Sequence, residues 1–154
     1  MNDCMKGKKR MIYKIALFLH ILSAVVAIGP LFAIFPMLKR MEKVEGALEK
    51  GMIEGLRGAV RAVSLAGHFI VPTGIILLLF SGWSWKTSWV LATIIMLVAS
   101  LLFLAKAFKP AWRIAEAAHF EKRLFIRTMR SATIKYILIM IVMLWLMVAK
   151  PQLW

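Results

Sequence analysis

Apolar residues occur along the chain in four long runs that are separated by basic and polar segments. The runs cover approximately residues 12–38, 62–83, 88–108 and 131–149. Each is long enough to cross a hydrocarbon core about 30 Å thick, which takes about 20 residues of α-helix. Because lipid offers no partner for unpaired backbone groups, helices are the expected form of these spans. The pattern therefore predicts an all-α, four-helix transmembrane bundle that forms a single integral membrane domain, 1–154.

The connections between these runs predict further structure at the membrane surface. Apolar residues recur at helical spacing in the first connection, at Met41, Val44, Leu48, Met52, Leu56 and Val60. This spacing, with charged residues between, predicts a helix that lies in the headgroup plane. We expect the mixed aromatic and basic connection 109–130 to continue span three out of the membrane and then turn. The connection 81–89 holds Trp83, Trp85 and Trp89, which mark a membrane–water interface and predict a tight hairpin between spans two and three.

Composition agrees with a membrane protein. Of 154 residues, 62% are apolar and the mean hydropathy is +0.80, whereas soluble domains contain about 45–50% apolar residues. The basic residues 8–10 and the apolar run after them resemble a secretory signal. Since the run continues to Leu38, we expect an uncleaved anchor. The single cysteine, Cys4, permits no internal disulfide and excludes a metal site built on cysteines.

The net charge of +14 also belongs to the membrane. In a soluble protein it would suggest nucleic acid, but here the basic residues flank the spans, so anionic lipid headgroups are the expected partner and nucleic acid is not. Lysine and arginine concentrate in the connections 39–61 and 109–130, which we call side B. The termini and the connection 81–89 form side A. Because basic loops stay cytoplasmic, side B is predicted to be cytoplasmic.

His20 is the one imidazole in the first run. It is about six residues, or about 9 Å, from the centre of the span near Val26, toward side A. It shares one helical face with Ser23, Ala24 and Ala27. Small residues beside a polar one mark a face that packs on other helices. We therefore expect His20 to point into the bundle.

Met143 and Met147 of span four are expected at the depth of His20. A histidine nitrogen and a methionine sulfur suit haem iron as axial ligands or Cu(I) as soft ligands. Methionine is also an adaptable filler of apolar cores, and eleven methionines occur here. His20 is thus the candidate metal ligand, and the two methionines are either its partners in a cofactor site or core residues.

His68 is expected about 16 Å from His20 in depth, too far for both to bind one iron even if the helices tilt. Lys106 and Lys135 are expected level with His68, and ionisable groups inside a span are candidates for function. Together with Arg61 they could receive an anion, such as a porphyrin propionate or a lipid phosphate. In the alternative, both lysines snorkel to the interface and His68 bonds a backbone carbonyl.

Three segments resemble a bacterial domain-of-unknown-function family of small four-helix integral membrane proteins. They are LHILSAVVAIGPLF in span one, a Pro-x-Gly followed by LLLFSGWSW in span two, and SWVLATIIMLVASLLFLAKAFKPAWRIAE in span three. This resemblance implies a multi-pass protein of the bacterial plasma membrane. More remotely, KIALFLHILSAVVAIGPLFAIFPML is similar to the first helix of HemJ-type protoporphyrinogen oxidases and of CopD-type copper proteins. His20 matches the HemJ-type histidine, which would imply haem b and porphyrin chemistry. Span three offers Lys106 and no histidine, a departure that weighs against the oxidase activity.

Two functions of different classes follow from the sequence. In the first, His20 ligates haem b, or alternatively copper, inside the bundle for redox or porphyrin chemistry. In the second, the protein is a non-catalytic accessory subunit or a binder of lipid or partner helices, including a second copy of itself, and His20 bonds a neighbour such as Ser23. No phosphate-binding loop, nucleophile elbow or zinc motif indicates an enzyme class.

Overall fold

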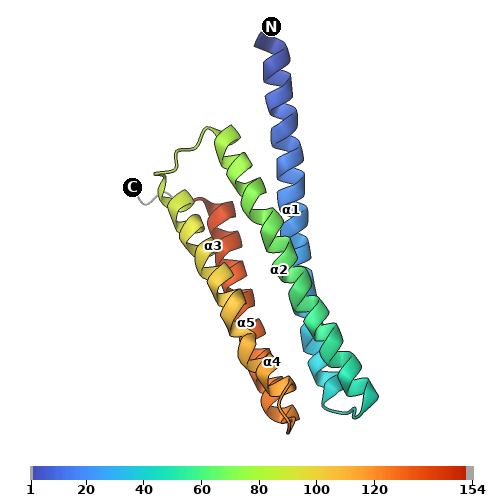
Figure 1. The fold of residues 1–154 in the computed structure, drawn as a ribbon. Coiled ribbons are helices and arrows are strands. Elements are labelled where there is room, and N and C mark those ends of the chain that lie inside the picture. Colours follow the sequence, from blue (N-terminus) through green and yellow to red (C-terminus); the bar gives the residue numbers. More distant parts are fainter. Residues whose placement is uncertain (1, 152–154) are drawn as a thin grey trace.

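Four long helices form the molecule, and they confirm the predicted all-α transmembrane fold (Figure 1). The computed structural model describes residues 2–151, with side chains from residue 7 onward, so the Cys4 thiol lies outside the described part. In that range the helices are α1 (Asn2–Met41), α2 (Ala47–Ser81), α3 (Ser88–Ala107), α4 (Lys109–Ala115) and α5 (Lys122–Ala149). Short α4 continues α3, and the two together form one of four segments that are long and apolar enough to cross a membrane.

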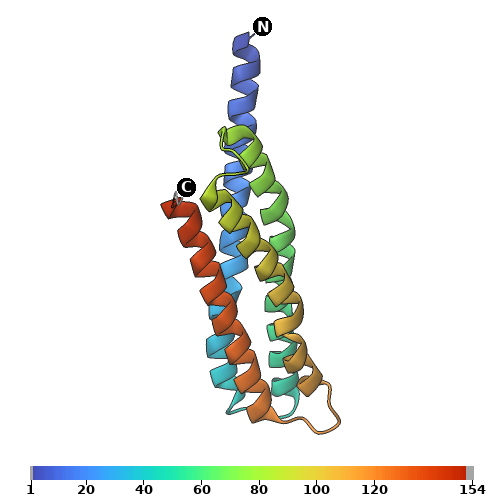
Figure 2. The same ribbon diagram turned by 90° about the vertical axis from the view of Figure 1, so that its left-hand side faces the viewer.

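The helices pack as two pairs, α1 with α2 and α3 with α5. The N-terminal end of α1, the C-terminal end of α5 and the α2–α3 connection lie at one end of the bundle, and the α1–α2 and α4–α5 connections lie at the other (Figure 1). These ends are the predicted sides A and B. Helix α1 projects beyond the other helices on side A (Figure 2). The expected tight hairpin of spans two and three is wrong, because α2 and α3 belong to different pairs and make little contact.

The first connection differs most from its prediction. The expected helix in the headgroup plane does not form, because the chain from Ala47 onward is the first half of α2, which runs unbroken to Ser81. Protein covers the part of its apolar stripe from Met52 onward: Leu56 is fully buried, and Met52 and Val60 pack on the core, whereas Leu48 is exposed. The spacing of apolar residues indicates a helix with one apolar face, but it is the same whether lipid or a neighbouring helix covers that face.

Two glycines allow α1 and α2 to turn and pack closely at side B. Gly46, which precedes α2, has a φ of 67°, in the left-handed region that favours glycine. At Gly55 a Cβ atom would lie 2.7 Å from Cε of Met37 on α1. Gly55 therefore serves the contact between the helices, as small residues do in membrane bundles.

The tertiary core lies toward side B. Its fully buried side chains come from α1, α2, α5 and the α3–α4 junction, and include Leu31, Ile34, Leu38, Met41, Leu56, Phe108, Phe125 and Met129. Two ion pairs tie α2 to α4 and α5 at this end. Arg57 donates to Glu116 at 2.8 Å, and Lys122 lies 3.5 Å from Glu49. The guanidinium of Arg57 also lies 5.3 Å from the ring centre of Trp112. As predicted, the chain leaves α3 through α4 and then turns before α5.

Candidate functional site

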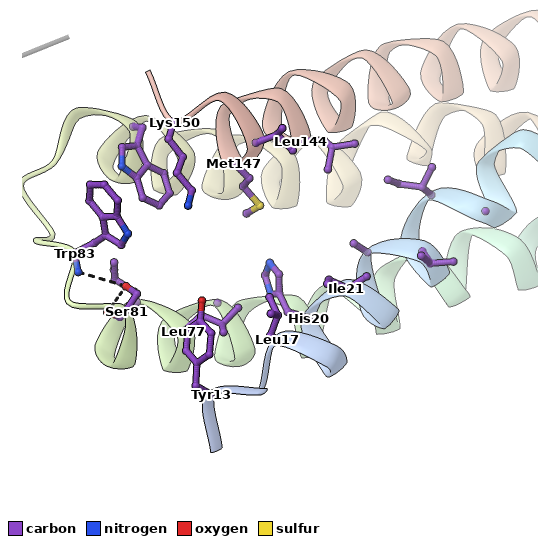
Figure 3. A pocket seen from close by; sticks show the side chains of 18 residues that line it. Tyr13, Leu17, His20, Ile21, Leu77, Ser81, Trp83, Leu144, Met147 and Lys150 are labelled. Atoms are coloured by element: carbon purple, nitrogen blue, oxygen red, sulfur yellow. Dashed lines mark hydrogen bonds between the residues drawn. The ribbon is translucent and has the colours of Figure 1, made fainter. Parts of the chain in front are cut away.

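A cavity of about 680 Å³ opens at the side-A end between α1, α2 and α5 (Figure 3). Most of its lining is apolar, with Leu17, Ile21, Ala24, Val25, Ile28, Leu77, Leu78, Leu144, Met147 and Val148. Its polar side chains are few, and His20 is set deepest, whereas Tyr13, Ser81 and Lys150 lie nearer the end of the bundle (Figure 3). The volume falls within the range of about 300–1,000 Å³ that is typical of ligand and cofactor pockets.

His20 is held against α2 by one nitrogen of its ring. Nδ1 lies 3.1 Å from the carbonyl oxygen of Ile70 and 3.0 Å from Oγ1 of Thr73. Because a carbonyl only accepts hydrogen bonds, the hydrogen-bond network assigns the proton to Nδ1. The Thr73 hydroxyl donates to the Phe69 carbonyl at 2.6 Å, so its oxygen can accept from His20. The lone pair on Nε2 therefore remains available, on a ring that points into the cavity (Figure 3).

This arrangement confirms that His20 points into the bundle. Its hydrogen-bond partners are Ile70 and Thr73, and not Ser23, the neighbour named in the sequence analysis. The hydroxyl of Ser23 donates to the carbonyl of Leu19 in its own helix, at 2.7 Å, and not to His20. Sequence reasoning missed Thr73 as a partner. It lies three residues after Ile70 and hence on the same face of α2, but only the packing of α1 on α2 reveals that this face meets His20.

Gly74 makes room for the imidazole. A Cβ atom at this position would lie 3.3 Å from Cε1 and 3.7 Å from Nδ1 of His20. Helix α2 runs through Pro72, so Thr73 and Gly74 follow the proline within a continuous helix. One residue thus supplies a hydrogen bond to the ring, and the next supplies the space for it.

Of the two candidate methionine partners, the structure brings one to His20. Met147 on α5 lines the same cavity, on the opposite wall from His20 (Figure 3). Met143 is buried among the core residues and does not line this cavity. The two lie on the same face of α5 one turn apart, so Met147 reaches the cavity near side A and Met143, one turn deeper, packs in the core.

Aromatic and basic side chains lie at the side-A end of the cavity. Trp83 and Trp89 meet edge to face, with ring centres 5.4 Å apart. The ammonium of Lys150 lies 5.7 Å from the centre of each ring, a distance at which a cation is attracted to an aromatic face. The cavity is therefore apolar inside and has a cation, Lys150, at its side-A end. From the sequence, the tryptophans were recognised only as markers of the membrane–water interface.

Residues 14–151 match the model of a family described as predicted integral membrane proteins, DUF2269. The chain belongs to the DUF2269 family. The match covers the four spans apart from the side-A extension of α1, so it establishes a multi-pass integral membrane protein. No curated protein and no solved structure matches the chain.

A metal ion in this DUF2269 protein would have few protein ligands. Among residues whose side chains are described, no three or more His, Cys, Asp or Glu residues form a group that could hold a metal. The cavity offers one imidazole nitrogen from His20 and one thioether from Met147. These two donors suit Cu(I). They also suit haem iron, which has four ligands from its porphyrin and needs only axial ligands from protein.

His68 lies closer to the level of His20 than the sequence predicted. The His20 ring contacts Ile70 and Thr73 of α2, which are two and five residues after His68. The difference in depth between the two histidines is therefore about 3–8 Å, and not the predicted 16 Å or so. The prediction was wrong because the limits of an apolar run do not fix how far one helix slides along another. His68 still does not share the site, since it lies about 200° around α2 from Ile70. It is exposed, and its Nδ1 bonds the Ser64 carbonyl at 2.8 Å.

The structure does not gather the candidate anion-binding residues of side B into one site. Lys106, Lys135 and Arg61 are all exposed. Among the described side chains, no hydrogen bond or ion pair joins them to one another or to His68. None of the three lines the cavity that contains His20.

Proposed function

We propose that this DUF2269 protein binds haem b in the side-A cavity, with Nε2 of His20 as an axial ligand, for redox or porphyrin chemistry in the membrane. The observation that carries the proposal is the anchoring of Nδ1 by the Ile70 carbonyl and the Thr73 hydroxyl. Histidines that bind metals almost always donate their other N–H to a carbonyl, carboxylate or water, which fixes the tautomer and the ring orientation. His20 has this arrangement, and its free nitrogen is on the ring that enters the cavity.

The rest of the cavity fits the same ligand. Apolar side chains of α1, α2 and α5 suit the faces of a porphyrin, and the Met147 thioether, across the cavity from His20, would be the second protein ligand. Lys150 can pair with a propionate carboxylate at the side-A end, where the ligand would meet water and headgroups. Bound haem would supply one-electron chemistry, while these residues bind it, orient it and exclude water.

Copper is the second candidate, because His20 and Met147 are soft donors on facing walls of one cavity. Haem is preferred since two protein donors complete the coordination of haem iron but leave a lone copper ion with few ligands. A non-catalytic accessory protein is the remaining alternative. It accounts for the bonds at Nδ1 but leaves Nε2 without a hydrogen-bond partner among the described residues.

The test is the visible spectrum of protein expressed with adequate haem and purified in mild detergent. We expect a Soret band that is mostly lost in His20→Ala and kept in His68→Ala, the matched control on the outer face of α2. Met147→Leu should keep the band but change the spectrum, because one axial ligand is replaced. Loss of the band in His68→Ala with retention in His20→Ala would show that the wrong histidine was chosen.

Two further outcomes would favour the alternatives. Wild-type protein that stays colourless after reconstitution with haem, but binds one equivalent of Cu(I) through His20, would support copper handling. Colourless protein that binds neither would support the accessory protein, with His20 as a buried hydrogen-bonding residue. Co-purifying lipid or a partner protein would then be the expected occupant of the apolar cavity.

A further inference from the structure

A second cavity, of about 500 Å³, lies at the opposite end of the bundle from His20. It is formed where α1 ends and α5 begins, and it is lined by Glu42, Lys122, Arg123, Ile126, Arg127 and Arg130. Four cations thus surround one space together with a single carboxylate. Sequence reasoning counted these cations for topology but assigned them no site.

The three arginines form one row along α5. Arg123, Arg127 and Arg130 are spaced by four and three residues, so their side chains emerge on the same face of the helix. Like charges at this spacing repel one another. The first turn of α5 contains no acidic residue, and the helix N-terminus adds a further partial positive charge. The folded protein therefore concentrates positive charge in this cavity.

Glu42 lines the cavity, but among the described side chains no carboxylate forms an ion pair with the row. In the part of the chain with described side chains, the ion pairs are Arg57 with Glu116 and Lys122 with Glu49, and neither includes an arginine of the row. Lys122 is held in place, because it also donates to the Val44 carbonyl at 2.7 Å. It forms a fixed wall of the cavity, while the three guanidinium groups remain available. Guanidinium matches phosphate oxygens with paired hydrogen bonds, which makes arginine well suited to phosphate recognition.

The depth of the arginine row in the membrane favours a lipid phosphate as the bound group. The apolar run of α5 begins at Ser131, directly after Arg130. The headgroup layer on each side of a bilayer is about 5–7 Å thick, which corresponds to about four residues of helix. We therefore expect Arg127 and Arg130 at the level of lipid phosphates, and Arg123 just outside. Ile126, only 6% exposed, gives the cavity an apolar floor toward the core.

We propose that this cavity binds the phosphate of an anionic phospholipid headgroup at side B. Basic pockets between transmembrane helices on the cytoplasmic side are known to bind such headgroups, and side B is the predicted cytoplasmic side. The bound phosphate relieves the repulsion within the row. This site is independent of the cavity that contains His20.

The test measures lipid retained by the full-length protein in detergent, using native mass spectrometry. The probes are phosphatidylglycerol and phosphatidylcholine with the same acyl chains. We expect preferential retention of phosphatidylglycerol, and a loss of about fivefold per neutralised charge, or roughly a hundredfold for Arg123→Gln, Arg127→Gln and Arg130→Gln together. The matched control neutralises residues 8–10, which removes three charges at side A, and should retain the lipid.

A second pair of variants keeps the proposal testable if the triple variant fails to fold. Glu42→Gln removes the one carboxylate that lines the cavity and should raise retention of phosphatidylglycerol about fivefold. Glu54→Gln, an exposed change elsewhere, should leave retention unchanged. Equal losses in the triple variant and in the side-A control would overturn the proposal, because they indicate general charge attraction. Equal retention of both lipids, with displacement by millimolar inorganic phosphate, would instead assign the cavity to free phosphate.

Discussion

Replacing Thr73 with valine removes one of the two acceptors that hold the His20 imidazole and keeps nearly the same side-chain shape. The hydroxyl lies 3.0 Å from Nδ1, and the carbonyl of Ile70 lies 3.1 Å from the same atom. After the substitution the carbonyl still accepts the Nδ1 proton. We therefore expect the ring to keep its tautomer and to lose part of its positional restraint.

The magnitude follows from that remaining bond. Loss of an outer-shell partner of a metal-binding histidine typically costs about 10–100-fold in metal affinity. Since Thr73 shares its role with the Ile70 carbonyl, we expect the low end, about tenfold, which corresponds to about 1.4 kcal/mol. The folded protein should lose about 1–3 kcal/mol of stability, because the hydroxyl also donates to the Phe69 carbonyl and each net hydrogen bond is worth about 0.5–1.5 kcal/mol.

The assay is a titration of the purified protein with haem, the proposed cofactor, followed at the Soret band. Nitrogen-15 NMR of the imidazole reports the tautomer whether or not haem is bound. Thr93→Val is the matched control, because Thr93 is 9% exposed against 7% for Thr73. Each hydroxyl also donates to the carbonyl four residues earlier, at 2.7 Å for Thr93 and 2.6 Å for Thr73. Unlike Thr73, Thr93 has no bond to His20.

Two results would refute this reasoning. Equal haem affinities of Thr73→Val and Thr93→Val would show that the hydroxyl does not orient the ligand. A wild-type imidazole protonated at Nε2 would show that the nitrogen facing the cavity is not the free one. The second result bears on the tautomer assignment directly and does not depend on any cofactor.

Two further predictions concern the space that Gly74 leaves for the His20 ring and the orientation of the protein in the membrane. Gly74→Ala should weaken haem binding more than Gly67→Ala. The new methyl group at residue 74 would lie 3.3 Å from the His20 ring, whereas at residue 67 it would lie 3.6 Å from the flexible end of a leucine. Equal Soret titrations of the two variants would contradict this. Native Cys4 should react with an impermeant thiol reagent added to intact cells, and a cysteine placed at Gly51 in a Cys4→Ser background should not. Labelling at Gly51 without labelling at Cys4 would show that the orientation is inverted.

The sequence alone determined the class of the protein and the vertical order of its parts. Four apolar runs of sufficient length can satisfy their backbone in lipid only as helices, so the four-span all-α fold followed from composition and spacing. The same pattern predicted that α4 continues α3 and that both long connections lie at one end. The sequence pattern also predicted that His20 lies on a helix face that packs against other helices, because small residues lie beside His20 on that face.

Tertiary structure decided which helices pair, how they slide along one another and what their faces meet. The stripe around Leu56 was predicted to face lipid, but it packs within the protein, since an apolar face is equally satisfied by either. The level of His68 relative to His20 depended on the register of α1 against α2, which side-chain packing sets and hydropathy does not. For the same reason, only the packed bundle could bring Thr73 and Gly74 to His20 and place Met147, but not Met143, across the cavity from it.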